Sequence, residues 1–306
     1  AVFFRFFLKI NIKKCIICVM SKDLTKLNYA QLVERSLMKK FRKSIWTKFI
    51  LALKRYKLVN EGDKIVVCVS GGKDSMLLAK LMQQLKKISD VNFEVVYICM
   101  NPGYNEKNLK QIEENAKKLE IPLHIFESDI FDSVANVEKS PCYLCARMRR
   151  GYLYSEAQKL GCNKIALAHH FNDVIETTLM GMFYGAQLQA MPPKLRSKNF
   201  EGMELIRPLY YVEEKDILAW KDYNELKFLQ CACRFTEMAQ NEDEISPSAR
   251  LNIKNLIKEL SKKIPDVENH IFKSIHNCNV DTMVGWKYKG KNYDFNEVYD
   301  NENKES

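Results

Sequence analysis

Glycine and proline are scarce in this sequence, with 11 Gly and 8 Pro among 306 residues. The chain also contains no internal repeat and no low-complexity linker. This scarcity, together with the plentiful aromatic residues, excludes a fibrous or an intrinsically disordered protein. Since 46% of the residues are hydrophobic, the length fits one large or two small globular domains.

Residues 1–19 lack any acidic residue and any unbroken apolar run. A secretory signal places its charges before an unbroken apolar stretch, whereas here basic residues interrupt the stretch. The segment is also too short and too charged to span a membrane. We therefore expect a cytoplasmic protein without a membrane anchor, in which residues 1–19 are an upstream extension without a folded role. Cys15 and Cys18 are then incidental, and a chain that starts at Met20 should keep full activity.

Acidic residues are also rare between Met20 and Asn60, where two of them stand against eleven Lys or Arg. The whole chain carries a formal net charge of +10, which favours an anionic partner such as nucleic acid or a membrane surface. The reverse holds for residues 291–306, which form an acidic tail that we expect to be frayed.

The order of hydrophobic patterns predicts an α/β fold. Residues 64–69 form a continuous run rich in β-branched side chains, typical of a parallel strand covered on both faces. Strand and helix patterns then alternate as far as residue 185, which predicts an open parallel sheet with helices on both faces. The expected strands are 64–69, 93–99, 122–126 and 164–168. The expected helices are 24–58, one from 75 onward, 105–119, 151–160, 172–183, 213–226 and 252–263, with a loop at 191–195.

The hexapeptide Ser70-Gly71-Gly72-Lys73-Asp74-Ser75 follows the first expected strand and opens a helix. Two adjacent glycines let the backbone approach a ligand closely and adopt positive φ. The amides of such a loop, with the positive end of the following helix, form a site for phosphate or pyrophosphate. Lys73 adds a charge, and Ser70 and Ser75 add hydroxyl groups. The spacing is not that of the Walker loop, and the alternative is an ordinary strand-to-helix turn.

The segment His169-His170-Phe171-Asn172-Asp173 follows the fourth expected strand. Ligands in open parallel sheets bind beyond the carboxyl ends of the strands, so we assign His169 and Asp173 to the same nucleotide site as the glycine loop. Asp173 could hold Mg²⁺ against the phosphates. The alternative for a lone buried histidine is a hydrogen-bonded core residue.

Closely spaced cysteines suggest metal or redox chemistry. Cys142 and Cys145 stand two residues apart, a spacing that can hold one metal or one edge of a cluster, and three arginines follow them. A redox disulfide or two core cysteines are the alternatives. In a second pair, Cys231 and Cys233 are too close to serve easily as two ligands of one iron. Three cysteine ligands suit an iron–sulfur cluster with one iron left open to exogenous sulfur.

In these residues the sequence resembles the tRNA 2-thiocytidine synthetase family of PP-loop ATP pyrophosphatases, over about residues 39–275. The matching blocks occur in the family's order and are together far more specific than any single motif. They are Glu61–Lys64, Ser70–Ser75, Cys142–Cys145 with Arg149–Gly151, Ile165–His170, Met182–Gly185, Gln189–Leu195, Ile206–Leu209 and Glu214–Ile217.

The resemblance implies ATP and a 4Fe–4S cluster held by Cys142, Cys145 and Cys231. Cys233 is a rival third ligand, because the family's second C-x-x-C is shortened here. The chain also has Ala168 where the family usually has glycine, and only Asp173 of the acidic pair that follows the histidines.

The implied reaction is a tRNA thiolation. ATP adenylates the C2 oxygen of a cytidine in the anticodon loop, with Lys73 and Asp74 as catalytic residues, and sulfur held on the cluster's open iron displaces AMP. The basic residues expected to hold tRNA phosphates are Lys39, Lys40, Arg42, Lys43, Arg147, Arg149 and Arg150, for which a solvated surface is the alternative. A sulfur donor such as a cysteine desulfurase is an expected partner, and a homodimer is open.

On this interpretation the chain has five parts: the extension (1–19), a basic helical segment (20–60), a PP-loop ATP-binding domain (61–185), a part that completes the cluster site (186–290) and the acidic tail. Two other readings stay open. One is a different PP-loop enzyme, such as a lysidine synthetase, which needs no paired cysteines, or a uridine thiolase, whose archaeal type usually carries further zinc-binding C-x-x-C pairs. The other is a non-catalytic RNA-binding metalloprotein, against which the intact glycine loop argues.

Overall fold

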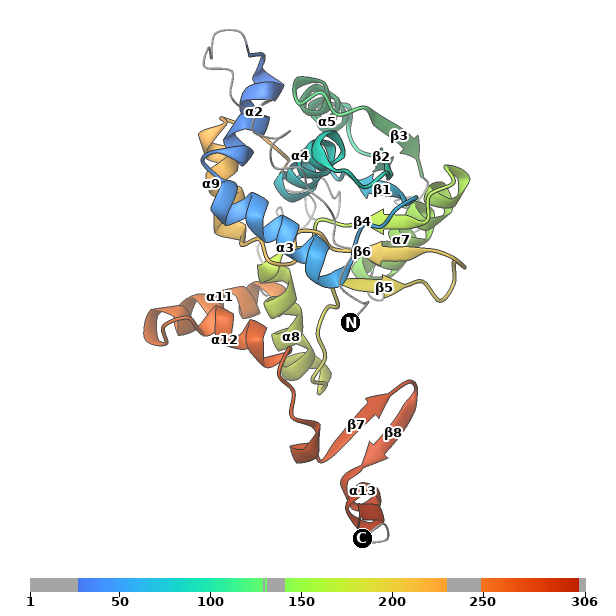
Figure 1. The fold of residues 1–306 in the computed structure, drawn as a ribbon, viewed down its shortest axis with the longest axis vertical. Coiled ribbons are helices and arrows are strands. Elements are labelled where there is room, and N and C mark those ends of the chain that lie inside the picture. The colour runs from blue at the N-terminus through green and yellow to red at the C-terminus, as the bar shows by residue number, and fades with distance from the viewer. Residues whose placement is uncertain (1–26, 129, 131–140, 230–248, 303–306) are drawn as a thin grey trace.

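The computed structural model describes residues 27–128, 130, 141–229 and 249–302. Their core is a six-stranded sheet in the order β3-β2-β1-β4-β6-β5, in which every neighbouring pair is parallel except β5 with β6. Helices cover both faces (Figure 1), so the predicted open parallel sheet is confirmed. In chain order the elements are α2 (Tyr29–Met38), η2 (Arg42–Trp46), α3 (Thr47–Tyr56), β1 (Lys64–Cys68), α4 (Lys73–Ile88), β2 (Glu94–Asn101), α5 (Glu106–Lys118), β3 (Leu123–Glu127), α7 (Pro141–Lys159), β4 (Lys164–Ala166), α8 (Phe171–Gly185), β5 (Lys194–Arg196), β6 (Glu204–Ile206), α9 (Glu214–Tyr223), α11 (Ala249–Lys263), α12 (Val267–Ser274), η3 (Val280–Thr282), β7 (Gly285–Tyr288), β8 (Lys291–Asp294) and α13 (Phe295–Glu302).

The continuous apolar run in β1 is explained by burial on both faces of the sheet. Successive side chains of a strand point to opposite faces, so Ile65 and Val67 join the larger core, which includes α4. Val66, between them, joins a second core that includes Tyr154 and Ala157 of α7. Helix α7 therefore lies on the opposite face of the sheet from α4, an arrangement that decides which side chains can meet at the site.

The helix predicted over residues 24–58 is interrupted. Helix α2 begins at Tyr29, because Asn28 and Gln31 cap each other reciprocally at 3.0 Å. A π-helical turn, η2, separates α2 from α3. Both Ile45 N and Trp46 N donate to the carbonyl of Phe41, at 2.9 and 3.2 Å, which marks the change in helical pitch. Periodicity alone does not reveal a break of this kind, since no Gly or Pro accompanies it.

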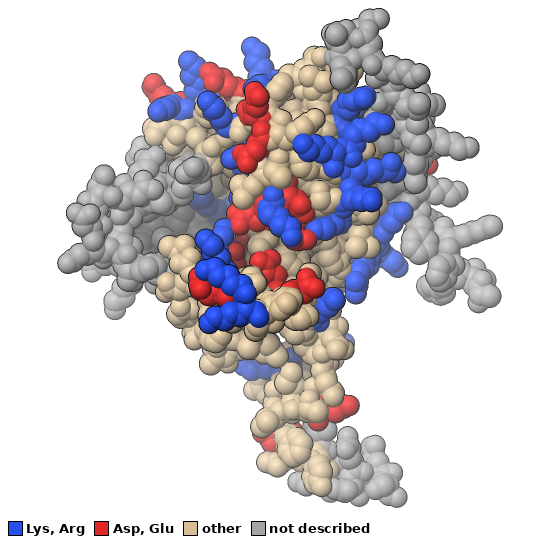
Figure 2. Space-filling model, turned by 90° about the vertical axis from the view of Figure 1, so that its left-hand side faces the viewer, with Lys and Arg blue, Asp and Glu red and all other residues tan. Residues whose placement is uncertain are grey.

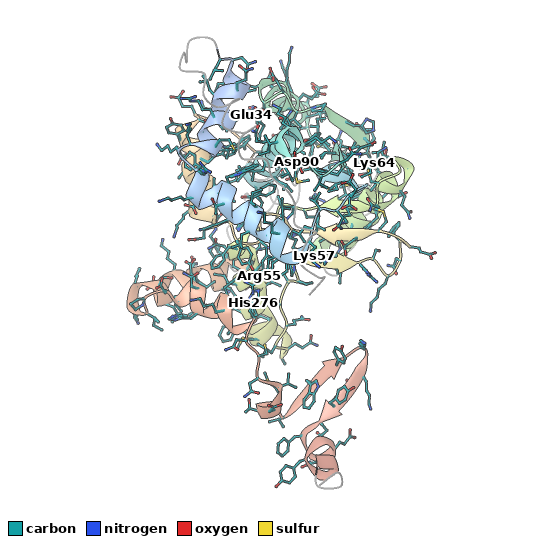
Figure 3. All side chains as sticks on the ribbon, viewed as in Figure 1. Glu34, Arg55, Lys57, Lys64, Asp90 and His276 are labelled. Carbon is teal, nitrogen blue, oxygen red and sulfur yellow. The ribbon has the colours of Figure 1, made fainter. Side chains whose placement is uncertain are left out.

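A buried ion pair joins α2 to α4. Lys80 of α4 is 0% exposed, and its Nζ donates to Glu34 Oε1 at 2.8 Å and to the Leu119 carbonyl at 2.9 Å. Glu34, labelled in Figure 3, also accepts from Lys87 at 2.7 Å. Helix α2 is thus held against α4 by the ammonium group of Lys80, which has no access to water.

Replacing Lys80 by Ala should lower the free energy of unfolding by about 3 kcal/mol, because a buried pair then loses one partner. Urea denaturation of the whole chain measures this change. Lys87→Ala is the matched control, since Lys87 contacts the same carboxylate oxygen but is half-exposed, and it should change stability by less than about 1 kcal/mol. Equal losses in the two variants would contradict the assignment of the stability to the buried pair.

The C-terminal third is more ordered than expected. Helix α11 agrees with its prediction, but α12, β6, β7 and β8 were not predicted, and β5 begins within the expected loop. Residues 291–302, which we expected to be frayed, form β8 and α13 instead, with β8 paired to β7. Strands of three or four residues are too short to show a period in the sequence. In the described ranges, no helix is long and apolar enough to cross a membrane.

Candidate functional site

The glycine loop and the histidine loop meet at one edge of the sheet. The loop Ser70–Gly72 connects β1 to α4, with Gly72 as the N-cap, and residues 167–170 connect β4 to α8, with His170 as the N-cap. Because β1 and β4 are adjacent and parallel, both loops leave the same carboxyl edge. The helix N-termini there are the expected positions for anion binding in such a sheet.

The hydroxyl group of Ser75 holds the glycine loop together. Ser75 Oγ donates to the carbonyl of Gly72 at 3.0 Å and accepts from Ser70 N at 3.1 Å. Ser70 Oγ lies 3.2 Å from the same oxygen. We predicted that both hydroxyl groups would serve a ligand, but Ser75 is buried and its bonds are made within the loop. Ser75 thus fixes the loop's shape.

Gly71 is required by both conformation and space. Its φ is +82°, and a Cβ placed there would lie 2.6 Å from Ile112 Cγ1 of α5 and 3.2 Å from Leu229 Cδ1. Leu229 N also donates to the carbonyl of Gly71 at 3.3 Å. The loop is therefore packed between α5 and the chain that leads toward Cys231, and its amides cannot be displaced independently.

Gly71→Ala should lower the free energy of unfolding by about 1–2 kcal/mol and weaken ATP binding, because the loop must shift to relieve the left-handed strain and the contact with Ile112. Thermal unfolding and calorimetric titration with ATP measure the two effects. Gly72→Ala is the control for stability, since Gly72 has no positive φ and its added Cβ would meet nothing closer than 3.7 Å. A stable Gly71→Ala protein with unchanged ATP affinity would contradict this reading.

A cleft of about 330 Å³ opens beside the loop, and its lining is mostly charged. The lining residues are Lys73, Asp74, His170, Asp173, Glu176, Glu214, Arg250, Leu251 and Lys254. Lys73 Nζ contacts Asp74 Oδ2 at 3.1 Å and Glu214 Oε1 at 3.2 Å, and Lys254 contacts Glu214 at 2.6 Å. Burial opposes ionisation of Glu214, but Lys254 and Lys73 outweigh it and lower its pKa to about 2. Burial likewise opposes the charge on Lys73, whose pKa is nevertheless raised by Asp74 and Glu214.

One carboxylate oxygen in this cleft is without a hydrogen bond. Asp74 Oδ1 is buried and has no hydrogen-bond partner among the described residues, and His170 Nε2 lies 3.8 Å away. Buried polar atoms in folded proteins are nearly always paired, so an unpaired carboxylate oxygen indicates a ligand with positive charge or a donor. In the described part of the chain, no three His, Cys, Asp or Glu side chains group closely enough to hold a metal by themselves. Mg²⁺ would therefore bind here through nucleotide phosphates and one or two carboxylates, its usual mode.

Both carboxylate oxygens of Asp173 already have partners in the described structure. Its Oδ2 accepts from His170 N at 2.9 Å, and its Oδ1 is paired with Arg250. Arg250 also donates to Glu176 at 2.8 Å. Asp173 lines the cleft as predicted, but a metal there would have to compete with Arg250, whereas Asp74 Oδ1 has no such competitor among the described residues.

Glu214, Arg250 and Lys254 are cleft residues that sequence reasoning missed. Glu214 lay in a matched family block, but we gave it no role. Arg250 and Lys254 stand four residues apart on α11, so they share one face of that helix. That spacing was visible in the sequence, but nothing local indicated that α11 packs back onto α8 and brings this face to the glycine loop.

The histidine in the cleft is His170, not the predicted His169. His169 is half-buried, and its buried Nδ1 has no hydrogen-bond partner in the described ranges. Burial, reinforced by the charge of Arg207, lowers the pKa of His169 to about 4, so its ring is neutral near pH 7. Neighbouring residues at a strand end point in different directions, and the sequence does not tell which of two histidines faces the ligand.

The cysteine-bearing helix begins at the same edge of the sheet. Helix α7 connects β3 to the parallel β4, and the chain after it lies at the amino end of β1, where Asn163 N donates to the Lys64 carbonyl at 3.0 Å. Cys142 and Cys145 fall in the first turns of α7, at the opposite, carboxyl end. Their side chains, with all of Cys231 and Cys233, lie outside the described residues.

The predicted RNA-binding residues differ in their setting. Lys39, Lys40, Arg42 and Lys43 are all exposed around the start of η2. The face of the molecule drawn in Figure 2 carries a band of Lys and Arg side chains along one side, next to a central group of acidic side chains. On α7, Arg150 is exposed and Arg149 is half-buried, whereas the side chain of Arg147 lies outside the described residues.

Comparison with known proteins agrees with this site. A family model described as a PP-loop domain matches residues 38–234. A tRNA-cytidine(32) 2-sulfurtransferase of Vibrio campbellii is 37% identical over 248 residues, which cover 79% of this chain and 78% of that protein. The enzyme of the same name from Acinetobacter baylyi is 36% identical over 249 residues, covering 79% and 77%. The chain belongs to the tRNA-cytidine(32) 2-sulfurtransferase family of PP-loop proteins.

A solved structure shows that this family's fold extends beyond its close relatives. A U34-tRNA thiolase from Methanococcus maripaludis, determined with its [4Fe–4S] cluster, superposes with a TM-score of 0.62 at 22% identity. The superposition covers 77% of this chain and 78% of that one. The resemblance stated from the sequence motifs is thereby confirmed for the family and for the fold.

Proposed function

We propose that this 2-sulfurtransferase family member is an ATP-dependent tRNA thiolase, which replaces the C2 oxygen of cytidine 32 in the anticodon loop with sulfur. Its curated relatives bear the name of that reaction. The observation that carries the proposal is the glycine-loop cleft, with the unpaired Asp74 Oδ1, at the same edge of the sheet as the start of the C-x-x-C helix. ATP chemistry and sulfur chemistry would thus act on one substrate position.

The described residues fit ATP with Mg²⁺. The backbone amides at the start of α4 and the charges of Lys73, Arg250 and Lys254 surround the space beside Gly71 and Gly72. They would hold the phosphates, and Asp74 Oδ1 would bind the metal that the phosphates bring. The cation–carboxylate pairs in the cleft would open when the phosphates enter, because each Lys or Arg there can exchange a carboxylate for a phosphate oxygen.

The cysteine set fits a three-ligand cluster site. Cys142, Cys145 and Cys231, or Cys233 as its rival, would hold the cluster, which when bound supplies an open iron for exogenous sulfur. One residue separates Cys231 from Leu229, whose amide donates to the Gly71 carbonyl of the glycine loop. The third ligand is therefore close in sequence to a residue that contacts the loop, which supports a cluster next to the nucleotide.

The residues of the cleft would act mainly by position and charge. In the first step the cytidine C2 oxygen attacks the α-phosphorus, a P–O bond forms, and the bond to pyrophosphate breaks. Lys73 and the α4 amides would stabilise the charge that develops on the phosphate oxygens. In the second step sulfur bonds to C2 and the C2–O bond breaks, releasing AMP. His169, whose ring is neutral near pH 7, carries no charge that this scheme requires.

The experiment that tests the function is a reconstituted reaction. The anaerobically purified protein is incubated with ATP, Mg²⁺, sulfide, free lysine and unmodified tRNA, and the digested tRNA nucleosides are examined by mass spectrometry. We expect 2-thiocytidine and one AMP per modified tRNA. Lysidine, thiouridine, or ATP-independent RNA binding alone would each assign the site to another function.

The remaining predictions extend this proposal. The sulfur donor would be a cysteine desulfurase, residues 20–60 and the arginines of α7 would hold tRNA phosphates, and residues 186–290 would complete the cluster site. A homodimer is compatible with the proposal but is not required by it.

A further inference from the structure

Arg207 is a buried cation at the carboxyl edge of the sheet, and among the described residues it has no anionic partner of its own. It is 8% exposed, and it directly follows β6. One of its terminal nitrogens, Nη1, donates to the carbonyl of Pro192, but Nε has no hydrogen-bond partner among the described residues. The carboxylate whose charge acts on Arg207 is that of Asp173, which is already paired with Arg250. A buried guanidinium in this condition is unfavourable unless an anion joins it.

The position of Arg207 places it on the α7 side of the sheet. Ile165 pairs with Leu205, and both lie in the second core with Tyr154 of α7. Arg207 follows Leu205 by two residues, so the alternation of a strand directs it to the same face. It does not line the nucleotide cleft, which lies beside α4 and α8. Arg207 is therefore available to the other reactant.

Two further groups converge on the same place. Arg150 of α7 is exposed and stands one helical turn before Tyr154, which packs with Leu205 in the second core, so Arg150 lies over the face of the sheet to which Arg207 is directed. Burial lowers the pKa of Arg207, and the positive charge of Arg150 lowers it further. The buried Nδ1 of His169 also has no hydrogen-bond partner in the described part of the chain. Burial lowers the pKa of His169, and the charge of Arg207 lowers it further. Two arginines that repel each other next to an unpaired ring nitrogen form a site that an anion with several acceptor oxygens would stabilise.

We propose that Arg207 and Arg150 together bind one phosphodiester of the RNA substrate, next to the nucleotide that is modified. The inference rests on the proposed function, which it deepens by naming a subsite. The site lies on the α7 face of the sheet, at the carboxyl edge where the nucleotide cleft also opens and where the C-x-x-C helix begins. A target nucleotide held at this edge would reach both. Arg207 is thus a positioning residue, since fixing the flanking phosphate fixes the base.

The test measures RNA and ATP binding separately on the full chain. Arg207→Gln should weaken binding of an anticodon stem–loop RNA about tenfold and reduce the slope of log K against log salt by about one. Its affinity for ATP should not change. Arg207→Lys keeps the charge but loses the planar guanidinium, so its RNA affinity should lie between those of the wild type and Arg207→Gln. An Arg207→Gln protein that binds RNA as the wild type does, or that loses ATP affinity equally, would overturn the subsite.

A double-mutant cycle tests whether the two arginines share one phosphate. Arg150→Gln should weaken RNA binding less in the Arg207→Gln background than in the wild type, because the shared contact is already lost. Arg42→Gln is the matched control, since Arg42 is exposed at the start of η2, away from α7 in the sequence, and its effect should add to that of Arg207→Gln. Additive effects for both pairs would contradict a shared phosphate.

A modified RNA settles the case in which Arg207→Gln does not fold. Uncharged methylphosphonates are placed singly at the phosphates that flank the target cytidine, and wild type is compared with Arg150→Gln. One position should weaken wild-type binding and abolish the difference between the two proteins. If no position behaves in this way, the proposal is overturned. A wild-type protein that binds no RNA at all would overturn the proposed function itself.

Discussion

Asp74→Asn should abolish thiolation, while tRNA binding and the protein fold are retained. The substitution is isosteric, but it replaces the charged, unpaired Oδ1 of the cleft by an amide group that binds a metal poorly. The Mg²⁺ that neutralises the phosphates would then be misplaced at the moment when charge develops on them. We expect turnover to fall by at least about a thousandfold.

The measurement is the rate of AMP formation with saturating tRNA, together with tRNA affinity and thermal stability. Asp216→Asn is the matched control. Asp216 lies on α9 and contacts Lys48 of α3 at 3.3 Å, but it does not line the cleft. Its rate should stay within a small factor of the wild type. If Asp74→Asn thiolates tRNA at the wild-type rate, the metal and the catalytic role of this carboxylate must be placed elsewhere.

The glycine loop could be predicted because its information is local. A buried strand, two glycines and a helix start lie together within residues 64–82, so the strand-to-helix direction of the loop can be predicted from this segment alone. The order of the strands in the sheet was not predicted. The outcome for Ser75 shows the limit of this reasoning. Its hydroxyl group looks like a ligand donor in the sequence, but only the folded loop shows that it bonds to Gly72 and Ser70.

The charged lining of the cleft could not be predicted because it comes from distant parts of the chain. Glu214 and Arg250 stand about 140 and 180 positions after the loop in the printed sequence, and their ion pairs depend on how α9 and α11 pack. The choice between His169 and His170 likewise depends on the place where β4 ends. The paired cysteines were visible as a motif, but their roles in a cluster stay predictions.

Fe–S content offers the sharpest test of those cysteine roles. Cys142→Ala and Cys145→Ala should each reduce bound iron from about four atoms per chain to nearly none, with loss of the visible absorption and of thiolation. A cluster with three protein ligands has no spare one, so removal of a single thiolate leaves two irons open and the cluster unstable. Anaerobic purification followed by iron, sulfide and zinc analysis measures the outcome.

The other cysteines of the chain make this test selective. Cys162 is buried in the second core and Cys278 is exposed, so changing Cys162 to Ala should affect stability, changing Cys278 should affect little, and neither should remove iron. Iron lost in Cys231→Ala but kept in Cys233→Ala would assign the third ligand to Cys231, and the reverse would assign it to Cys233. Zinc alone, or an active enzyme without metal, would contradict the cluster. Cys142, Cys145, Cys231 and Cys233 would then need another role, while the nucleotide site, which depends on none of them, would stand.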